Sequence, residues 1–223
     1  MSMIWYLSPS NQGANVGVGN YGTEKEQMYL LADAIIPHLD RAGVSFLLAD
    51  PDATLAQRVT ESNSIGAGFH FCLHSNAGGG GKARGPVALY YSDTGKYFGE
   101  KLVSALLALG QETNRSYHVK QEKGLYELRK TAAPACLLEV DFHDSDGGVA
   151  FITQRRAEIA EAIAKVIIAA DGKEFVPVTA GEYVDEAIRL GLFPRKTPWQ
   201  QPMTYEAAAE LAVKLLDQMK RGA

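Results

Sequence analysis

The sequence predicts an α/β fold: a mostly parallel, twisted sheet of about five or six strands with helices on both faces, followed by a small helical C-terminal tail. Short apolar runs alternate with longer helical patterns over the first 170 residues, which is typical of a parallel sheet covered by helices. Beyond Ala170 the chain becomes rich in turn residues and then helical again. These observations divide the chain into a main α/β domain over residues 1–171 and a small extension over residues 172–223.

Five apolar runs bounded by turn residues are expected to form the strands of the sheet. They are Met3–Leu7, Val44–Leu48, Phe69–Leu73, Val87–Tyr91 and Ala135–Val140.

Four segments of the main domain have the apolar spacing of helices. They are Glu24–Arg41, Leu55–Ser64, Tyr97–Leu109 and Gln154–Ala170. Pro37 lies inside the first of them and lacks a backbone N–H, so we expect a kink or an early end near Ile36.

The extension has two helical patterns, over Tyr183–Leu190 and Met203–Arg221. It is too short to hold a core of its own, so we expect it to pack on the main domain, on a partner, or on a second copy in a homodimer.

Composition excludes several classes of protein. The net charge of −4 argues against a nucleic-acid partner, which favours a basic face. No apolar run approaches the roughly 20 residues of a membrane span, and the N-terminus lacks the pattern of a signal peptide. Cys72 and Cys136 lie inside apolar strands, which favours small buried core residues over a disulfide.

Two histidines lie in the stretch FHFCLHSNAGGGG, which begins at Phe69. His70 and His74 share a face of the strand, but four residues separate them by roughly 13 Å, too far for one metal ion. His74 is the better ligand because it closes the strand, and ligands bind at the carboxyl ends of parallel strands. His70 lies deeper, which favours a structural role with a hydrogen-bond partner.

The glycine run after Asn76 does not fit a phosphate-binding loop, because Asn76 and Ala83 stand where that motif requires Gly and Ser or Thr. A flap beside the site is the better interpretation.

Two carboxylates are candidates for chemistry. Glu139 lies near the end of an apolar run, where its burial needs compensation by a metal, by hydrogen bonds, or by Arg129 or Lys130. Glu24 follows Thr23 at a helix start, a position equally typical of a charge that stabilises the helix dipole. His143 lies in the polar turn after the strand of Glu139 and can fold back to the same edge.

These stretches together resemble the zinc-dependent N-acetylmuramoyl-L-alanine amidases of the Amidase_3 type, which include phage endolysins. IWYLSPSNQG stands where the family has a strand followed by D-P-G-H-G-G, and TEKEQM stands at its metal glutamate. FHFCLHSNAGGGGKARGPVALYY is similar to the S-I-H-A-N block, and LYELRKTAAPACLLEVDFHDSD to the block that carries the catalytic glutamate. The resemblance covers about residues 3–170.

The resemblance implies Zn²⁺ as cofactor, Glu24 and His74 as metal ligands and Glu139 as the catalytic carboxylate. The family's first metal histidine falls at Asn11 or Gln12 in this chain. Gln12 is the favoured replacement and His143 the alternative ligand, although an amide oxygen is a poorer zinc donor than an imidazole.

Asn76 and Arg84, which flank the glycine run, are expected to contact the substrate.

The function implied by the resemblance is hydrolysis of the amide between N-acetylmuramic acid and L-alanine in peptidoglycan. Without a signal peptide, such a protein would be made in the cytoplasm and act at the cell wall after release through a holin or by lysis. The alternative, raised by the missing histidine, is a degenerate amidase fold that binds peptidoglycan or a partner without turnover. Cell-wall binding is then a further role open to the extension.

Overall fold

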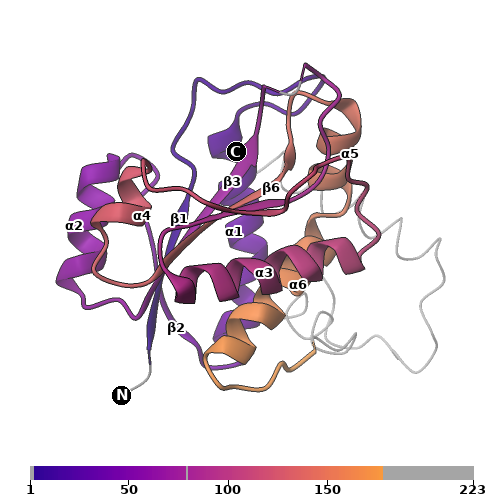
Figure 1. The fold of residues 1–223 in the computed structure, drawn as a ribbon. Coiled ribbons are helices and arrows are strands. Elements are labelled where there is room, and N and C mark those ends of the chain that lie inside the picture. The colour runs from indigo at the N-terminus through magenta and orange to yellow at the C-terminus, as the bar shows by residue number, and fades with distance from the viewer. Residues whose placement is uncertain (1–2, 79, 178–223) are drawn as a thin grey trace, which may run out of the picture. The chain divides into compact units, whose positions relative to one another are not determined.

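The computed structural model describes residues 3–78 and 80–177, and these form a six-stranded sheet with helices on both faces (Figure 1). The strand order is β2-β1-β3-β6-β4-β5, and every neighbouring pair is parallel except β4 and β6. The predicted fold class is therefore confirmed.

The five predicted strands are present with shifted ends. Their bounds are β1 Ile4–Pro9, β2 Ser45–Leu48, β3 Phe69–Asn76, β4 Val87–Tyr90 and β6 Ala135–Phe142. β3 and β6 are each longer than predicted at their carboxyl ends. His74 therefore lies inside β3, where it pairs with Glu139 of β6. A short edge strand that the apolar pattern does not reveal, β5 Val119–Gln121, pairs with β4.

The helices follow the predicted pattern, with two additions. Their bounds are α1 Glu24–Arg41, α2 Leu55–Ser64, α3 Asp93–Ala108, α4 Tyr126–Lys130, α5 Asp146–Gln154 and α6 Arg156–Ala170. None of the helices in the described ranges has the length and apolar character needed to cross a bilayer.

The two faces of the sheet are covered differently. The main core lies between one face and helices α1, α3 and α6, with Leu7, Phe71 and Leu138 from the sheet at its centre. On the other face α2 packs beside α4, and a small apolar cluster joins Leu128 of α4 to Leu137 (Figure 1). This second face also carries buried polar side chains, which are described below.

Helix α1 starts at Glu24 because its N-terminus is capped by Thr23. The Thr23 hydroxyl accepts a hydrogen bond from the backbone N–H of Glu26, and the Glu26 carboxylate accepts one from the N–H of Thr23. The helix runs through Pro37 to Arg41, so the early end near Ile36 is wrong. Asp33, whose carbonyl loses a helical partner at Pro37, is exposed to water.

The predicted extension over residues 172–223 lies outside the described residues from position 178 onward. Its helices and its role stay predictions.

Candidate active site

The candidate site lies where the carboxyl ends of β1, β3 and β6 meet. These three strands are parallel neighbours in the sheet, and the loop after β1 leads to the start of α1 at the same edge. The topology thus brings together Glu24 from α1, His74 from β3 and Glu139 from β6, as is usual for the ligand sites of parallel sheets.

Glu24 does not serve as the capping charge of its helix, because Thr23 and Glu26 already satisfy the helix start. Its side chain is buried, and its Oε1 lies 2.8 Å from Nδ1 of His74. Its Oε2 accepts a hydrogen bond of 2.9 Å from the amide of Asn15.

Glu24 and His74 form a buried hydrogen-bonded pair, which each group's pKa reflects. Burial alone would raise the pKa of Glu24, but the hydrogen bond and charge of His74, with further hydrogen bonds from Asn15 and Ser10, lower it. Burial alone would lower the pKa of His74, but its hydrogen bond to Glu24 and the charge of Glu139 raise it. A cation bound between these groups would compete with a proton for the His74 imidazole.

Glu139 lies opposite His74 in the register of the β3–β6 ladder. Its Oε2 is shielded from solvent and has no hydrogen-bond partner among the described residues. Arg129 and Lys130, the predicted alternative partners, are exposed on α4. Burial raises the pKa of Glu139 to about 7; the charge of His74 lowers it and that of Glu24 raises it further.

Three amide side chains of the loop between β1 and α1, where the family has its first metal histidine, have different hydrogen-bond partners. The Asn11 amide donates to the backbone oxygen of Ala53, away from Glu24. Gln12 is exposed, and its side-chain oxygen accepts a hydrogen bond of 2.7 Å from Asn15. Asn15, which sequence reasoning did not single out, is the loop amide that contacts Glu24.

His143 is buried beside the site and bonded to a neighbour of His74. Its Nδ1 lies 2.8 Å from the hydroxyl of Ser75, which is also 2.7 Å from the hydroxyl of Tyr21. The Tyr21 ring stacks on the His143 imidazole. Nδ1 of His143, the alternative metal ligand expected from the sequence, is thus hydrogen-bonded to Ser75.

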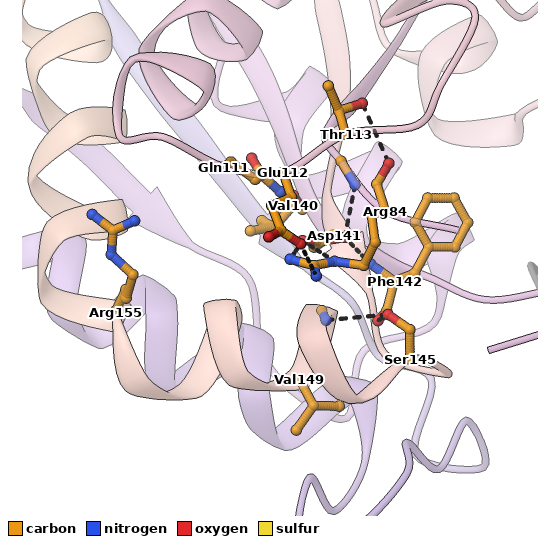
Figure 2. Close-up of polar contacts among 12 residues, drawn as sticks. Arg84, Gln111, Glu112, Thr113, Val140, Asp141, Phe142, Ser145, Val149 and Arg155 are labelled. Atoms are coloured by element: carbon orange, nitrogen blue, oxygen red, sulfur yellow. Dashed lines mark hydrogen bonds and ion pairs between the residues drawn. The ribbon is translucent and has the colours of Figure 1, made fainter. Parts of the chain in front are cut away.

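Arg84 joins the glycine loop to the end of β6 (Figure 2). Its guanidinium lies 3.3 Å from Oδ2 of the fully buried Asp141 and 3.0 Å from the exposed carboxylate of Glu112. Asp141 also accepts a hydrogen bond of 2.8 Å from the N–H of Gly85. Arg84, the predicted substrate-binding residue, is therefore paired with carboxylates of the protein itself. Its buried partner Asp141, two positions after Glu139, was not predicted from the sequence.

The other predicted substrate-binding residue, Asn76, is half-buried at the end of β3. Its side-chain oxygen accepts from the N–H of Ala77, and its backbone oxygen accepts from the N–H of His143. In the glycine run that follows, the N–H of Gly78 donates to the carboxylate of Asp144 at 3.1 Å, so this loop is joined to the turn after β6.

A second buried polar cluster lies deeper on the same strand face. His70 is fully buried, with Nδ1 3.0 Å from the hydroxyl of Ser62 and Nε2 3.1 Å from Oε1 of Glu127. His70 therefore has the side-chain partners expected of a structural histidine. Within the described residues, ligand atoms of His70, Cys72 and Glu127 lie within 4.8 Å of one another, which makes them a second candidate metal-binding group.

This second cluster has its own charge balance. Burial alone would raise the pKa of Glu127, but the hydrogen bond and charge of His70 and a hydrogen bond from Ser8 lower it. The Ser8 hydroxyl lies 2.6 Å from Glu127 and accepts a hydrogen bond of 3.2 Å from the buried guanidinium of Arg58. Both cysteines of the chain, Cys72 and Cys136, are free and buried, as predicted.

Comparison with known protein families gives one family match. Residues 7–169 match the family model described as N-acetylmuramoyl-L-alanine amidase (Amidase_3). A curated relative, the N-acetylmuramoyl-L-alanine amidase CwlM of Bacillus licheniformis, is 27% identical over 149 residues. The aligned stretch covers 63% of this chain and 56% of the relative, so the chain spans little more than half of that protein.

Solved structures share the fold. The catalytic domain of the N-acetylmuramoyl-L-alanine amidase CwlV from Bacillus (Paenibacillus) polymyxa var. colistinus superposes with a TM-score of 0.67 at 20% identity, covering 78% of this chain and 100% of that one. The catalytic domain of the CD27L endolysin, which targets Clostridia difficile, gives a TM-score of 0.63 at 20% identity, covering 76% and 98%. At these identities the similarity establishes the fold.

Proposed function

Because the chain belongs to the N-acetylmuramoyl-L-alanine amidase family, we propose that it is a zinc-dependent hydrolase that cleaves the amide between N-acetylmuramic acid and L-alanine in peptidoglycan. The observation that carries this proposal is the buried Glu24–His74 pair. On the neighbouring strand, one carboxylate oxygen of Glu139 has no hydrogen-bond partner in the described part of the chain.

The chemistry of the donor groups fits zinc. Glu24 and His74 present a carboxylate and an imidazole at one point, and both are common zinc ligands. The family is generally zinc-dependent. A zinc ion held there would act as a Lewis acid on the substrate's amide carbonyl and would make a water molecule more acidic.

Glu139 is then the general base and acid. Its carboxylate takes a proton from the attacking water and passes it to the leaving amine of L-alanine. Burial raises the pKa of Glu139, which makes its carboxylate a stronger base than that of an exposed glutamate. Oε2 of Glu139 has no hydrogen-bond partner among residues 3–78 and 80–177, so within that part of the chain no side chain competes for the proton.

The His70–Cys72–Glu127 group is the competing place for the metal ion, and two observations favour Glu24 and His74 over it. Burial raises the pKa of the Cys72 thiol, which disfavours the thiolate form that a metal ion would need there. The Arg58 guanidinium, joined to Glu127 through Ser8, supplies a positive charge that would oppose a cation there.

A second candidate function is a module that binds peptidoglycan without turnover. It is favoured by the direction of Asn11, which stands at the block of the missing histidine and donates to Ala53. The two candidates differ in zinc content and in product, so one experiment separates them.

The experiment measures zinc content and wall digestion of the same preparations. Wild type, Glu24→Ala and His74→Ala would be loaded with zinc, desalted, analysed for metal and incubated with purified cell walls. We expect wild type to hold one zinc per chain and to reduce wall turbidity, and both variants to lose zinc. A wild type that holds no zinc and digests nothing would favour the binding module.

Release to the wall through a holin or by lysis, and docking, dimerisation or wall binding through residues 172–223, stay part of the proposal. Chemical crosslinking with and without the extension tests the dimer.

A further inference from the structure

We propose that Asn15 is the residue of the β1–α1 loop that tunes the metal centre, and that it does so by holding the second carboxylate oxygen of Glu24. This inference rests on the proposed zinc site. The sequence favours Gln12 as the loop residue that binds the metal ion. Asn15, which the sequence does not single out, instead has the role of positioning Glu24.

The two oxygens of Glu24 have different partners. Oε1 faces Nδ1 of His74 at 2.8 Å, whereas Oε2 accepts from Nδ2 of Asn15 at 2.9 Å. A metal ion held by Glu24 and His74 would take the place of the first contact, and the Asn15 amide would hold the other carboxylate oxygen. Asn15 would thereby restrict the rotation of the carboxylate and keep Oε1 free for the ion.

The backbone fixes Asn15 in this position. Its carbonyl accepts a hydrogen bond of 2.8 Å from the N–H of Glu24, so both ends of the contact share one turn. Val16 and Thr23 form a β-bridge, and the N–H of Gly17 donates to the carbonyl of Gly22 at 3.0 Å. The loop is thus closed on the N-terminus of α1 immediately after Asn15.

Local sterics explain why this closure needs glycine. At Gly17, a Cβ atom would come within 2.4 Å of the Tyr21 ring. Gly22 has a φ of +76°, a conformation that L residues other than glycine rarely adopt. These glycines belong to the turn that places Asn15 against Glu24.

Two other amides of the loop, Asn11 and Gln12, have partners other than Glu24. Asn11 donates to Ala53, and Gln12 is exposed and accepts from Asn15. The Gln12 side chain therefore contacts Asn15 and not Glu24. Outer-shell hydrogen bonds to metal ligands typically change metal affinity by about 10- to 100-fold when removed.

The test measures zinc affinity directly, by competition with a chromophoric chelator, in wild type, Asn15→Ala, Asn15→Asp and the matched controls Gln12→Ala and Asn11→Ala. We expect Asn15→Ala to weaken zinc by about 10- to 100-fold. Both controls should stay within about threefold of wild type. Thermal unfolding of each metal-free variant verifies that the fold is retained.

Asn15→Asp separates positioning from direct ligation. If the amide donates to Glu24, a second carboxylate repels it and zinc affinity falls. If the Asn15 oxygen itself binds the metal, the added charge raises the affinity, and the positioning role is overturned.

The inference is also overturned if Asn15→Ala binds zinc like wild type or if Gln12→Ala loses as much affinity. A wild type that binds no zinc would instead contradict the proposed function on which the inference rests.

Discussion

Glu139 lies directly opposite His74 on the neighbouring parallel strand, so one ladder position places a candidate base beside a candidate metal ligand. Sheet register is a rigid relationship, because a slip by one residue would turn every side chain of the strand to the other face. The spacing of these two groups is therefore set by the sheet and is independent of the loops around the site.

The raised pKa of Glu139 predicts a pH-dependent stability of the metal-free protein. The folded pKa of about 7 exceeds the ordinary value of 4.5, so the folded state binds the proton more tightly. The resulting stabilisation is complete below pH 4.5 and is lost as pH rises through about 7. We expect Glu139→Gln to raise the free energy of unfolding above pH 7, by roughly 1–3 kcal/mol.

Urea unfolding with a metal chelator present, at pH 5 and pH 8, checks this prediction. The same stability increment for Glu139→Gln at both values would contradict a raised pKa.

The Glu127–His70 pair predicts the opposite pH dependence of stability, with a loss of stability in acid. The pKa of Glu127 is lowered, so its stabilising contribution is present above the ordinary value of 4.5 and is lost as pH falls through the lowered pKa. Glu127→Gln should destabilise the protein at pH 7 and have a smaller effect at the acid end. Denaturant titrations of both proteins from pH 7 downward measure the difference, and parallel stability curves would refute the pairing.

Cys72→Ala is expected to leave the zinc content unchanged, because the proposed centre contains no sulfur ligand. Substitution with Co²⁺ gives a direct check, since a thiolate ligand produces a charge-transfer band in the near ultraviolet that a centre of Glu24 and His74 lacks. Cys136→Ala is the matched control, as it removes the other buried thiol. A thiolate band in wild type that disappears only in Cys72→Ala would move the metal to His70, Cys72 and Glu127.

Arg84→Ala should destabilise the protein by about 1–3 kcal/mol, because it removes the cation beside the fully buried Asp141. Glu112→Ala removes the other partner of Arg84, but that carboxylate is 81% exposed, so the cost should stay within about 0.5 kcal/mol. Thermal or urea unfolding compares the two variants. Equal effects would show that the ion pair with Asp141 contributes no more than a surface contact.

Most of the fold could be predicted from the sequence because its central strands are continuous apolar runs. β5, α4 and α5 are the exceptions. β5 has three residues, mostly exposed, and α4 has five, so neither presents a full period of apolar side chains. α5 begins with Asp-Gly-Gly, a sequence typical of a turn. Pro37 was misleading for a local reason, since Ile35 and Leu39 are buried on either side of it and hold the helix to the core.

Only part of the candidate site could be predicted from the sequence. Glu24, His74 and Glu139 stand at strand and helix ends, where position along the chain indicates position in space. Asn15 could not be recognised, because its contact with Glu24 depends on how a loop of small residues closes. For Asp141 a signal existed: it is an acidic residue two positions after Glu139, at the end of the same apolar run.

The most direct test is the release of new N-terminal alanine from purified peptidoglycan by zinc-loaded wild type and Glu139→Gln, with zinc content measured in both. We predict that the variant keeps its zinc and loses about 100- to 10,000-fold in rate, since general acid–base catalysis contributes that much. A variant that releases alanine at the wild-type rate, or a zinc-loaded wild type that releases none, would contradict the proposal that Glu139 acts beside a metal held by Glu24 and His74.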